Sequence, residues 1–360
     1  MNRLFRHTVI LILTGLFLTG CVYEDTVRDV SDYRADGEGL AIAFNDGFVD
    51  NPIRTKAVDQ PLLSRHMKSM GVWGWQKTPA ENVECLFLNK EVTFNSSLGR
   101  WTYSPVKYWD NSSTYRFCAY APHASSAPGV TAAIDATTMS ISLTGVTLNG
   151  SNTIGTATGK APANFADVDD IDWMVDRNVQ SMAGMYHNEV SFNMQHILSK
   201  LCVRVLRSDA FLSETEMNIT IDSVTIGQFV RQGNFTASGS TDPATLATEW
   251  TPVDTLPRYT MCSAKNVSIP DTAVYIYIME SLLIPQSVNE NHIIQIRYKI
   301  GNPGGFINEF NATFRLDEKF DLFLPGRNYI ITLLINPETI TFDGGQSGWE
   351  DQTTIRKNIN

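Results

Sequence analysis

The residues that could carry out chemistry are scattered along this 360-residue sequence. Its six histidines are dispersed, and none belongs to a His-Glu-x-x-His pair of the kind that holds catalytic zinc. The late run Gly345-Gln-Ser347-Gly348 lacks the spacing of a Gly-x-Ser-x-Gly nucleophile turn. Neither a Gly-x-x-x-x-Gly-Lys phosphate loop nor a Gly-x-Gly-x-x-Gly dinucleotide turn is present. We therefore predict that the protein is not an enzyme and uses no cofactor.

Acidic residues crowd together near the middle of the chain. They are Asp167, Asp169, Asp170, Asp172 and Asp176. Calcium prefers oxygen ligands of this kind, but the spacing does not match an EF-hand loop. A solvated acidic linker is the simpler interpretation, so we predict no metal site. His196 follows within an apolar stretch, which is more typical of a core or edge histidine than of a metal ligand.

The seven tryptophans allow two interpretations. Trp73 and Trp75 alternate with Gly74 and so share one face of a strand, and Trp101 is followed by Tyr103 in the same spacing. Exposed rings at Trp73, Trp75 or Trp101 would offer a stacking platform for a glycan, whereas buried rings would fill a sandwich core. Core packing is the interpretation that we favour, and glycan stacking is the alternative.

The N-terminus has the layout of an export signal. Arg3 and Arg6 precede an apolar run over residues 9–18, which is too short to span a bilayer as a permanent helix. The tetrapeptide Leu18-Thr19-Gly20-Cys21 resembles the bacterial lipobox, in which the cysteine is acylated and becomes the new N-terminus. We predict a lipoprotein signal peptide over residues 1–20, lipidation at Cys21 and attachment to the outer membrane. Residues 21–38 are polar and without periodicity, and they are predicted to form a tether.

Charge and cysteine content narrow the possible partners. The chain has 28 Lys and Arg against 38 Asp and Glu, a formal net charge of −10, and no basic run, so we expect no nucleic-acid partner. Apart from Cys21, the cysteines are Cys85, Cys118, Cys202 and Cys262, with no Cys-x-x-Cys pair among them. Apolar surroundings favour buried free thiols at the first three, and a disulfide among them or with Cys262 stays open.

The dominant hydrophobic period from residue 39 onward is two, which is typical of strands. Residues 40–44, 115–121 and 190–194 show it clearly, and turn sequences such as Asn149-Gly150 separate such runs. Residues 196–206 fit helical spacing as well as strand spacing, and their β-branched content favours a strand toward the end.

These patterns predict an all-β fold. We expect two tandem β-sandwich domains after the signal peptide and tether, the first over residues 39–185 and the second over residues 186–360.

Several segments taken together resemble the fimbrillin family, the subunits of surface fimbriae in Gram-negative anaerobes. They occur in the expected order along nearly the whole mature chain, beside the lipobox. The segments are Trp101-Thr-Tyr103-Ser-Pro105-Val-Lys-Tyr108-Trp109, Tyr115-Arg-Phe117-Cys-Ala119-Tyr120-Ala-Pro122, Val190-Ser-Phe192-Asn-Met-Gln-His196-Ile-Leu-Ser-Lys200-Leu, Leu324-Pro-Gly326-Arg-Asn-Tyr329 and Gly348-Trp349.

The resemblance implies two stacked transthyretin-like β-sandwiches in a surface lipoprotein of the outer membrane or fimbrium. It also implies cleavage after an arginine, loss of the first strand, and refilling of the groove by a strand from a neighbouring subunit. Here the removable strand would carry Leu40, Ile42 and Phe44, and the cleavage site would be Arg54, with Arg34 second. Both arginines are also compatible with ordinary loop positions.

The late segments 335–340 and 355–359 are short candidates for the donor strand. The resemblance leaves a stalk, anchor or tip role open, as well as the host or bacterial receptor. The alternative function is a glycan-binding surface lipoprotein.

Overall fold

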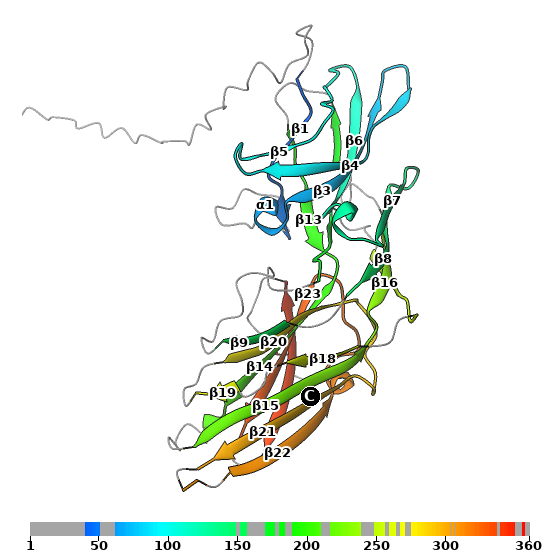
Figure 1. The fold of residues 1–360 in the computed structure, drawn as a ribbon. Coiled ribbons are helices and arrows are strands. Elements are labelled where there is room, and N and C mark those ends of the chain that lie inside the picture. Colours follow the sequence, from blue (N-terminus) through cyan, green and yellow to red (C-terminus); the bar gives the residue numbers. More distant parts are fainter. Residues whose placement is uncertain are drawn as a thin grey trace, which may run out of the picture.

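The structure is a computed structural model. It describes residues 40–50, 62–148, 152–156, 170–176, 180–183, 189–209, 217–238, 248–255, 259–263, 267–270, 275–302, 304–305, 307–336, 339–349 and 355–356. These residues form an elongated, almost entirely β molecule with an N-terminal lobe, a smaller sheet beside its middle, and a C-terminal lobe (Figure 1). In the described part of the chain, no helix combines the length and the apolar character needed to cross a membrane.

The N-terminal lobe is built on an eight-stranded sheet. Its strands run in the order β2 (Phe48–Val49), β13 (Asn193–His196), β10 (Met174–Val175), β6 (Thr114–Ala121), β3 (Ser69–Lys77), β4 (Val83–Asn95) and β5 (Arg100–Thr102), and β11 (Gln180–Ala183) pairs with β6. A separate pair joins β1 (Ala43–Phe44) to β12 (Glu189–Val190), and one helical turn, α1 (Leu63–His66), lies nearby. Alternation along β3 and β6 directs Val72 and Phe117 into the core of this lobe.

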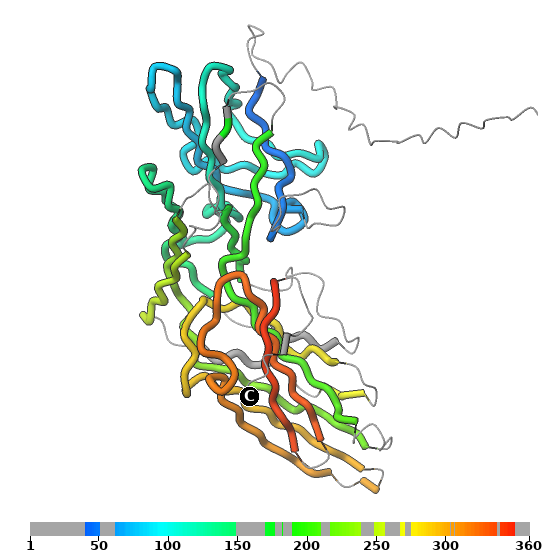
Figure 2. The backbone as a smooth tube through the Cα atoms, turned by 180° about the vertical axis from the view of Figure 1, so that it is seen from behind, coloured from blue at the N-terminus to red at the C-terminus, as the bar shows by residue number. Residues whose placement is uncertain are grey.

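A four-stranded sheet lies beside the middle of the molecule. Its order is β17 (Thr248–Pro252), β16 (Gln232–Ala237), β8 (Ser140–Thr147) and β7 (Thr131–Asp135), and the 3₁₀ turn η2 (Ala124–Ser126) leads into it from β6. Leu143 and Phe235 from this sheet share one hydrophobic cluster with Trp73 of the N-terminal sheet and with Leu282 and Trp349 of the C-terminal lobe. The view from behind shows this sheet alongside the junction of the two lobes (Figure 2).

The C-terminal lobe is a sandwich of two sheets. One sheet has the order β25 (Ile355–Arg356), β24 (Ile340–Gly348), β23 (Arg327–Ile335), β14 (Ser199–Arg207), β20 (Ile276–Leu283) and β9 (Asn152–Thr156). The other has the order β18 (Tyr259–Ser263), β15 (Asn218–Phe229), β21 (Ile293–Gly301) and β22 (Ile307–Arg315), with β19 (Val267–Ile269) also on β15 and the 3₁₀ turn η5 (Leu316–Glu318) after β22. Val203 and Ile331 from the first sheet meet Ile221 and Ile296 from the second in the core between them.

The all-β prediction is confirmed, and the ambiguous segment 196–206 forms a strand. Strand β14 pairs with β23 in parallel over nine residue pairs and with β20 in antiparallel fashion on its other side. Strand partners on both edges satisfy its backbone groups, and this outweighs the helical spacing of its apolar residues.

Strands that precede residue 185 and strands that follow it pair with one another in the same sheets. Strand β8 pairs with β16, and β9 pairs with β20, whereas β12 and β13 belong to the N-terminal lobe. The division into domains at that residue stays a prediction, and a cut there would separate each of these strands from its partners.

Candidate strand-exchange site

The segment over residues 40–50 supplies part of the N-terminal core. Leu40, Ile42, Phe44 and Val49 are 0%, 1%, 3% and 0% exposed. The first three alternate along an extended chain, so their side chains point to the same face, which is the face turned toward the core. The sequence pattern that predicted a strand here therefore coincides with buried positions.

One edge of this segment pairs with β12 and β13 in parallel. Three of its backbone N–H groups donate to carbonyl oxygens of that neighbour: Asn45 to Val190 at 3.1 Å, Phe48 to Phe192 at 2.9 Å, and Asp50 to Met194 at 2.8 Å. Parallel pairing brings together segments that lie far apart in sequence, because two adjacent strands joined by a tight turn run antiparallel.

The other edge contacts the loop between β5 and β6. Ile42 N–H donates to the Lys107 carbonyl at 2.8 Å, and Trp109 N–H donates to the Leu40 carbonyl at 2.9 Å. The hydroxyl of Tyr103 also donates to the Ile42 carbonyl at 2.7 Å. The segment thus lies between β12–β13 on one edge and the β5–β6 loop on the other. Its removal would leave backbone hydrogen-bonding groups of both neighbours unpaired.

Phe44 is the centre of the aromatic packing. Its ring lies 5.6 Å from the rings of Phe87 and Tyr103 in edge-to-face contact, 6.3 Å from Phe117, and 5.9 Å from Phe192 in a stacked arrangement. Such contacts add to the transfer free energy of a buried ring. Phe48, in contrast, is half-buried and lies outside the hydrophobic clusters.

The end of the segment is held by a buried histidine. Asp50 Oδ1 accepts a hydrogen bond from the backbone N–H of His196 at 3.3 Å, and its Oδ2 lies 3.5 Å from His196 Nε2. His196 Nδ1 lies 2.9 Å from Asp172 Oδ2, and the imidazole stacks on Trp349 at 4.1 Å. These contacts link the N-terminal segment to the end of β24, so the two lobes meet at the point where the segment ends.

The comparisons with known proteins agree with this architecture. The sequence pattern of the fimbrillin-like family matches residues 55–349. The chain belongs to the fimbrillin-like family. As a member of this family, the chain is a fimbrial or adhesive component of the cell surface. No match was found among the curated proteins.

Three solved structures are among those similar to this chain. A fimbrial protein from Bacteroides vulgatus is 15% identical with a TM-score of 0.59, and the match covers 86% of this chain and 99% of that one. A putative cell adhesion protein from Bacteroides uniformis is 15% identical with a TM-score of 0.45, covering 88% and 99%. A tip fimbrial protein from Porphyromonas gingivalis is 9% identical with a TM-score of 0.31, covering 79% and 95%. At these identities, the first of them shows the fold alone.

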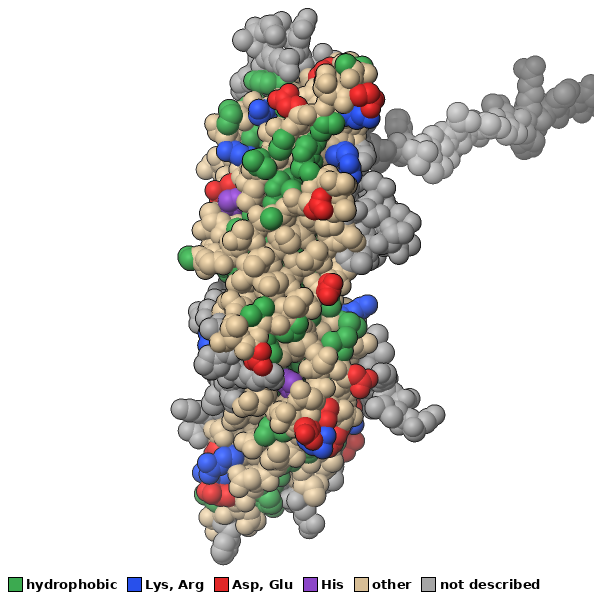
Figure 3. All heavy atoms as spheres, turned by 90° about the vertical axis from the view of Figure 1, so that its right-hand side faces the viewer, with side chains coloured by type: hydrophobic (Ala, Val, Ile, Leu, Met, Phe, Trp, Pro, Cys, Tyr) green, Lys and Arg blue, Asp and Glu red, His purple; other side chains and the backbone are tan. Residues whose placement is uncertain are grey.

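The tryptophans predicted as a possible glycan platform are mostly core residues of this fimbrillin-like chain. Trp73 is 1% exposed and Trp101 is 5% exposed, so neither ring can stack on a sugar at the surface. Trp75 is half-buried against the cluster that contains Trp73. Figure 3 shows hydrophobic side chains gathered on the upper part of one face, and Val83 and Leu88 are among the exposed large hydrophobic residues of this lobe. The glycan alternative therefore loses two of its three proposed rings.

The cysteines differ from the prediction at one position. Cys118 and Cys202 are buried free thiols, but Cys85 is exposed, although it is also free. Burial raises the pKa of the Cys118 thiol to about 12 and raises the pKa of Cys202 as well. Cys85 lies opposite Trp75 across the β3–β4 pair, on the sheet face away from Phe87. The register shift between Gly74 and Trp75 interrupts the alternation between Cys85 and Phe87, so Cys85 is exposed although Phe87 is buried, and local sequence does not show such a shift.

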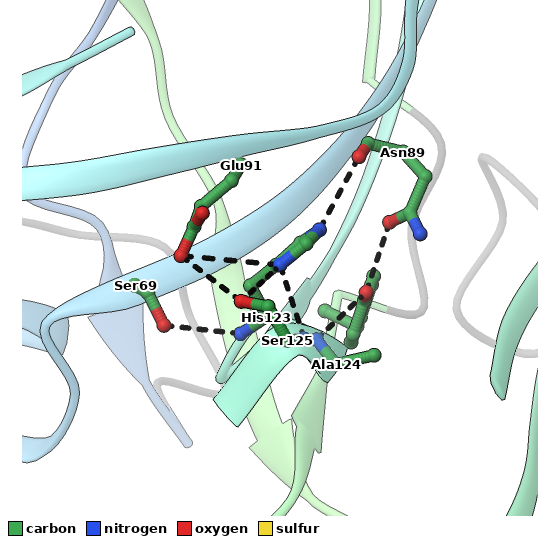
Figure 4. Close-up of polar contacts among 7 residues, drawn as sticks. Ser69, Asn89, Glu91, His123, Ala124 and Ser125 are labelled. Atoms are coloured by element: carbon green, nitrogen blue, oxygen red, sulfur yellow. Dashed lines mark hydrogen bonds and ion pairs between the residues drawn. The ribbon is translucent and has the colours of Figure 1, made fainter. Parts of the chain in front are cut away.

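A polar cluster around His123 brings serine, histidine and glutamate together (Figure 4). Ser125 Oγ and Glu91 Oε1 both approach His123 Nδ1, at 2.8 and 3.9 Å, while Nε2 faces the Asn89 carbonyl at 3.3 Å. A hydrolytic triad needs the serine and the carboxylate on opposite ring nitrogens. The contacts instead hold the turn after β6, where His123 N–H also donates to Ser69 Oγ. Within the described ranges, no three His, Cys, Asp or Glu side chains are grouped as metal ligands.

Cys21, Arg34 and Arg54 lie outside the described residues. Lipidation and cleavage at these positions stay predictions from the sequence.

Proposed function

We propose that this chain is a fimbrial subunit that joins its neighbours by strand exchange at the site of residues 40–50. The observation that supports it is that four core side chains come from a segment held to its lobe by noncovalent contacts on both edges. An extended strand with alternate apolar side chains can occupy such a groove and form the same backbone hydrogen bonds.

The position of Arg54 makes it the cleavage site that fits this function. Arg54 follows the segment and Arg34 precedes it. Cleavage after Arg54 would separate residues 40–50 from the rest of the chain, whereas cleavage after Arg34 would leave them covalently attached to it. Cleavage after Arg54 would also separate the subunit from the lipid at Cys21, so an uncut copy would stay anchored to the outer membrane.

The donor strand would come from a neighbouring subunit. Of the two donor candidates in the sequence, segment 335–340 includes the ends of β23 and β24, and Ile335 and Ile340 are buried in the C-terminal core. The described part of the other, Ile355–Arg356, pairs with β24 as a short β25. The donor is therefore identified best by experiment.

The test is limited digestion of the folded mature chain with an arginine-specific endopeptidase, which leaves Lys56 uncut, followed by electrophoresis in SDS without boiling. Wild type and the control Arg34→Ala should give ladders of SDS-resistant oligomers, and Arg54→Ala should stay monomeric. The N-terminal residue of the oligomers should be Thr55. Ladders of equal strength from Arg54→Ala, or monomers from cut wild type, would contradict the proposal.

A further inference from the structure

The strand of residues 40–50 is interrupted between Phe44 and Phe48. Strand β1 ends at Phe44, and β2 begins at Phe48. The neighbouring strands are interrupted at the same level, because β12 ends at Val190 and β13 begins at Asn193. Two residues of this interruption, Asp46 and Gly47, make close contacts with the rest of the lobe.

Gly47 lies against the backbone of the neighbouring strand. A Cβ atom at this position would lie 2.3 Å from the Phe192 carbonyl oxygen and 3.2 and 3.3 Å from its C and N atoms. Backbone atoms cannot rotate away as the end of a side chain can, so any larger residue would force the strands apart. The Gly47 carbonyl also accepts a hydrogen bond from Leu63 N–H at 2.8 Å, which fixes the chain from the side of α1.

Asp46 receives hydrogen bonds from three groups. Its Oδ1 accepts from Ser64 N–H at 2.8 Å and from Trp101 Nε1–H at 3.3 Å, and its Oδ2 accepts from the Ser64 hydroxyl. Ser64 and Trp101 are 7% and 5% exposed. If an entering strand offered no acceptor here, these buried donors would lose their partner, which is unfavourable.

Apolar burial alone does not fix the register of a strand in this groove. Leu40, Ile42 and Phe44 repeat every two residues, so a shift by two residues keeps apolar side chains directed inward. Asp46 and Gly47 break this repeat, because their contacts are available at one level of the groove only.

We propose that the groove recognises an acidic residue followed by glycine in the strand that enters it, and that this pair sets the register. The proposal rests on the strand-exchange function proposed above. The partner is thus an extended segment of a neighbouring subunit with three alternate apolar residues, one spacer residue, and then the acid–glycine pair. Segments 335–340 and 355–359 of this chain lack that pair, so the proposal excludes both as the donor.

The experiment uses the full mature chain, cut after Arg54 and separated from its released segment under mild denaturant. Fluorescein-labelled peptides of residues 40–50 are titrated with this protein, and the dissociation constant is measured by anisotropy. The wild-type peptide should bind. Gly47→Ala should weaken binding by about a hundredfold or more, from the backbone overlap. Asp46→Ala should weaken it by on the order of tenfold to a hundredfold, from the unpaired donors.

Matched peptides separate recognition from general weakening. Ala43→Ser changes a half-buried position of the same segment and should bind within about threefold of wild type, as solvent can reach the added hydroxyl. Asp46→Asn keeps an oxygen acceptor and should bind more tightly than Asp46→Ala. A peptide with the order of residues 46 and 47 exchanged has the same composition and should bind poorly. In a Trp101→Phe protein, which lacks the indole donor, the difference between wild-type and Asp46→Ala peptides should shrink.

The outcomes are distinguishable. If the wild-type peptide binds but Asp46→Ala, Gly47→Ala and the exchanged peptide bind equally well, acid–glycine recognition is wrong and strand exchange stands. If the cut and depleted protein binds none of the peptides, strand exchange at this groove is itself wrong, and the recognition proposal fails with it.

Discussion

Replacing Phe44 by alanine tests how much the segment of residues 40–50 contributes to the N-terminal core. The ring is 3% exposed and contacts the rings of Phe87, Tyr103, Phe117 and Phe192. Phe→Ala at such a site removes the transfer free energy of the ring and leaves a cavity, so the free energy of unfolding should fall by about 3–5 kcal/mol. Large aromatic neighbours cannot readily collapse into the space, which favours the upper half of that range.

Phe48→Ala is the matched control. Phe48 belongs to the same segment, but it is half-buried and outside the hydrophobic clusters, so we expect a loss of about 1 kcal/mol or less. Both variants keep the backbone hydrogen bond from Phe48 N–H to the Phe192 carbonyl. The comparison therefore isolates the contribution of the buried ring.

The assay has an equilibrium arm and a kinetic arm. Urea unfolding followed by tryptophan fluorescence and circular dichroism gives the change in stability of the uncut chain. After cleavage at Arg54, the rate at which the segment leaves should rise by roughly two to three and a half orders of magnitude for Phe44→Ala, if the full loss is expressed in dissociation. Equal losses for Phe44→Ala and Phe48→Ala in both arms would refute the assignment of Phe44 as the anchor of the segment.

Three further predictions concern the anchor, the thiols and the buried histidine. Cys21→Ser should move the protein from the membrane fraction to the soluble fraction, and a variant that still fractionates with membranes would remove the lipoprotein assignment. With the other cysteines changed to serine, iodoacetamide should label exposed Cys85 in the folded chain, faster as the pH rises because partial burial raises its thiol pKa. Cys118 should react only after unfolding, and its labelling in the native state would contradict the core packing. His196→Ala should destabilise the N-terminal lobe by roughly 2–4 kcal/mol, since it removes the imidazole that faces Asp50 and Asp172, and hydrogen exchange at the Asp50 amide should accelerate.

Local alternation in the sequence was sufficient to predict strands but not their breaks or partners. Residues 190–194 alternate without interruption, yet the structure divides them between β12 and β13. The break lies against Gly47, where the opposing strand is also interrupted, more than 140 residues earlier in the chain. Likewise, β14 becomes a strand because β23 and β20 pair with its two edges, and neither is near it in sequence. Pairing of this kind is set by tertiary contacts that periodicity does not contain.

The candidate site shows the same limit in its side chains. The preference for a core position at His196 agrees with the structure, but its two aspartate neighbours come from segments 40–50 and 170–176. The sequence predicts Asp172 in a solvated acidic linker, and this is wrong because Asp172 is 6% exposed. A carboxylate that faces a buried imidazole can be buried with it, and only the fold brings those residues together. As an aromatic residue, Trp101 is a sequence candidate for glycan stacking. In the structure it is buried, and its indole N–H donates a hydrogen bond to Asp46.

In the proposed strand exchange, the parallel pairing of the N-terminal segment would let it leave without unravelling the lobe. Its parallel neighbours β12 and β13 come after β3 to β6 in the sequence, so its pairing with them is not part of a hairpin. Without β2, the sheet order from β13 through β10, β6, β3 and β4 to β5 is still continuous. Cleavage of the connecting chain alone does not drive the segment out, because its buried side chains and its hydrogen bonds on both edges remain in place. An entering strand that offers the same apolar spacing can displace it step by step from one end, with each backbone hydrogen bond re-formed as it is lost. Exchange then depends on the competing strand and on its register at Asp46 and Gly47, and a cut subunit without a suitable neighbour should keep its own segment.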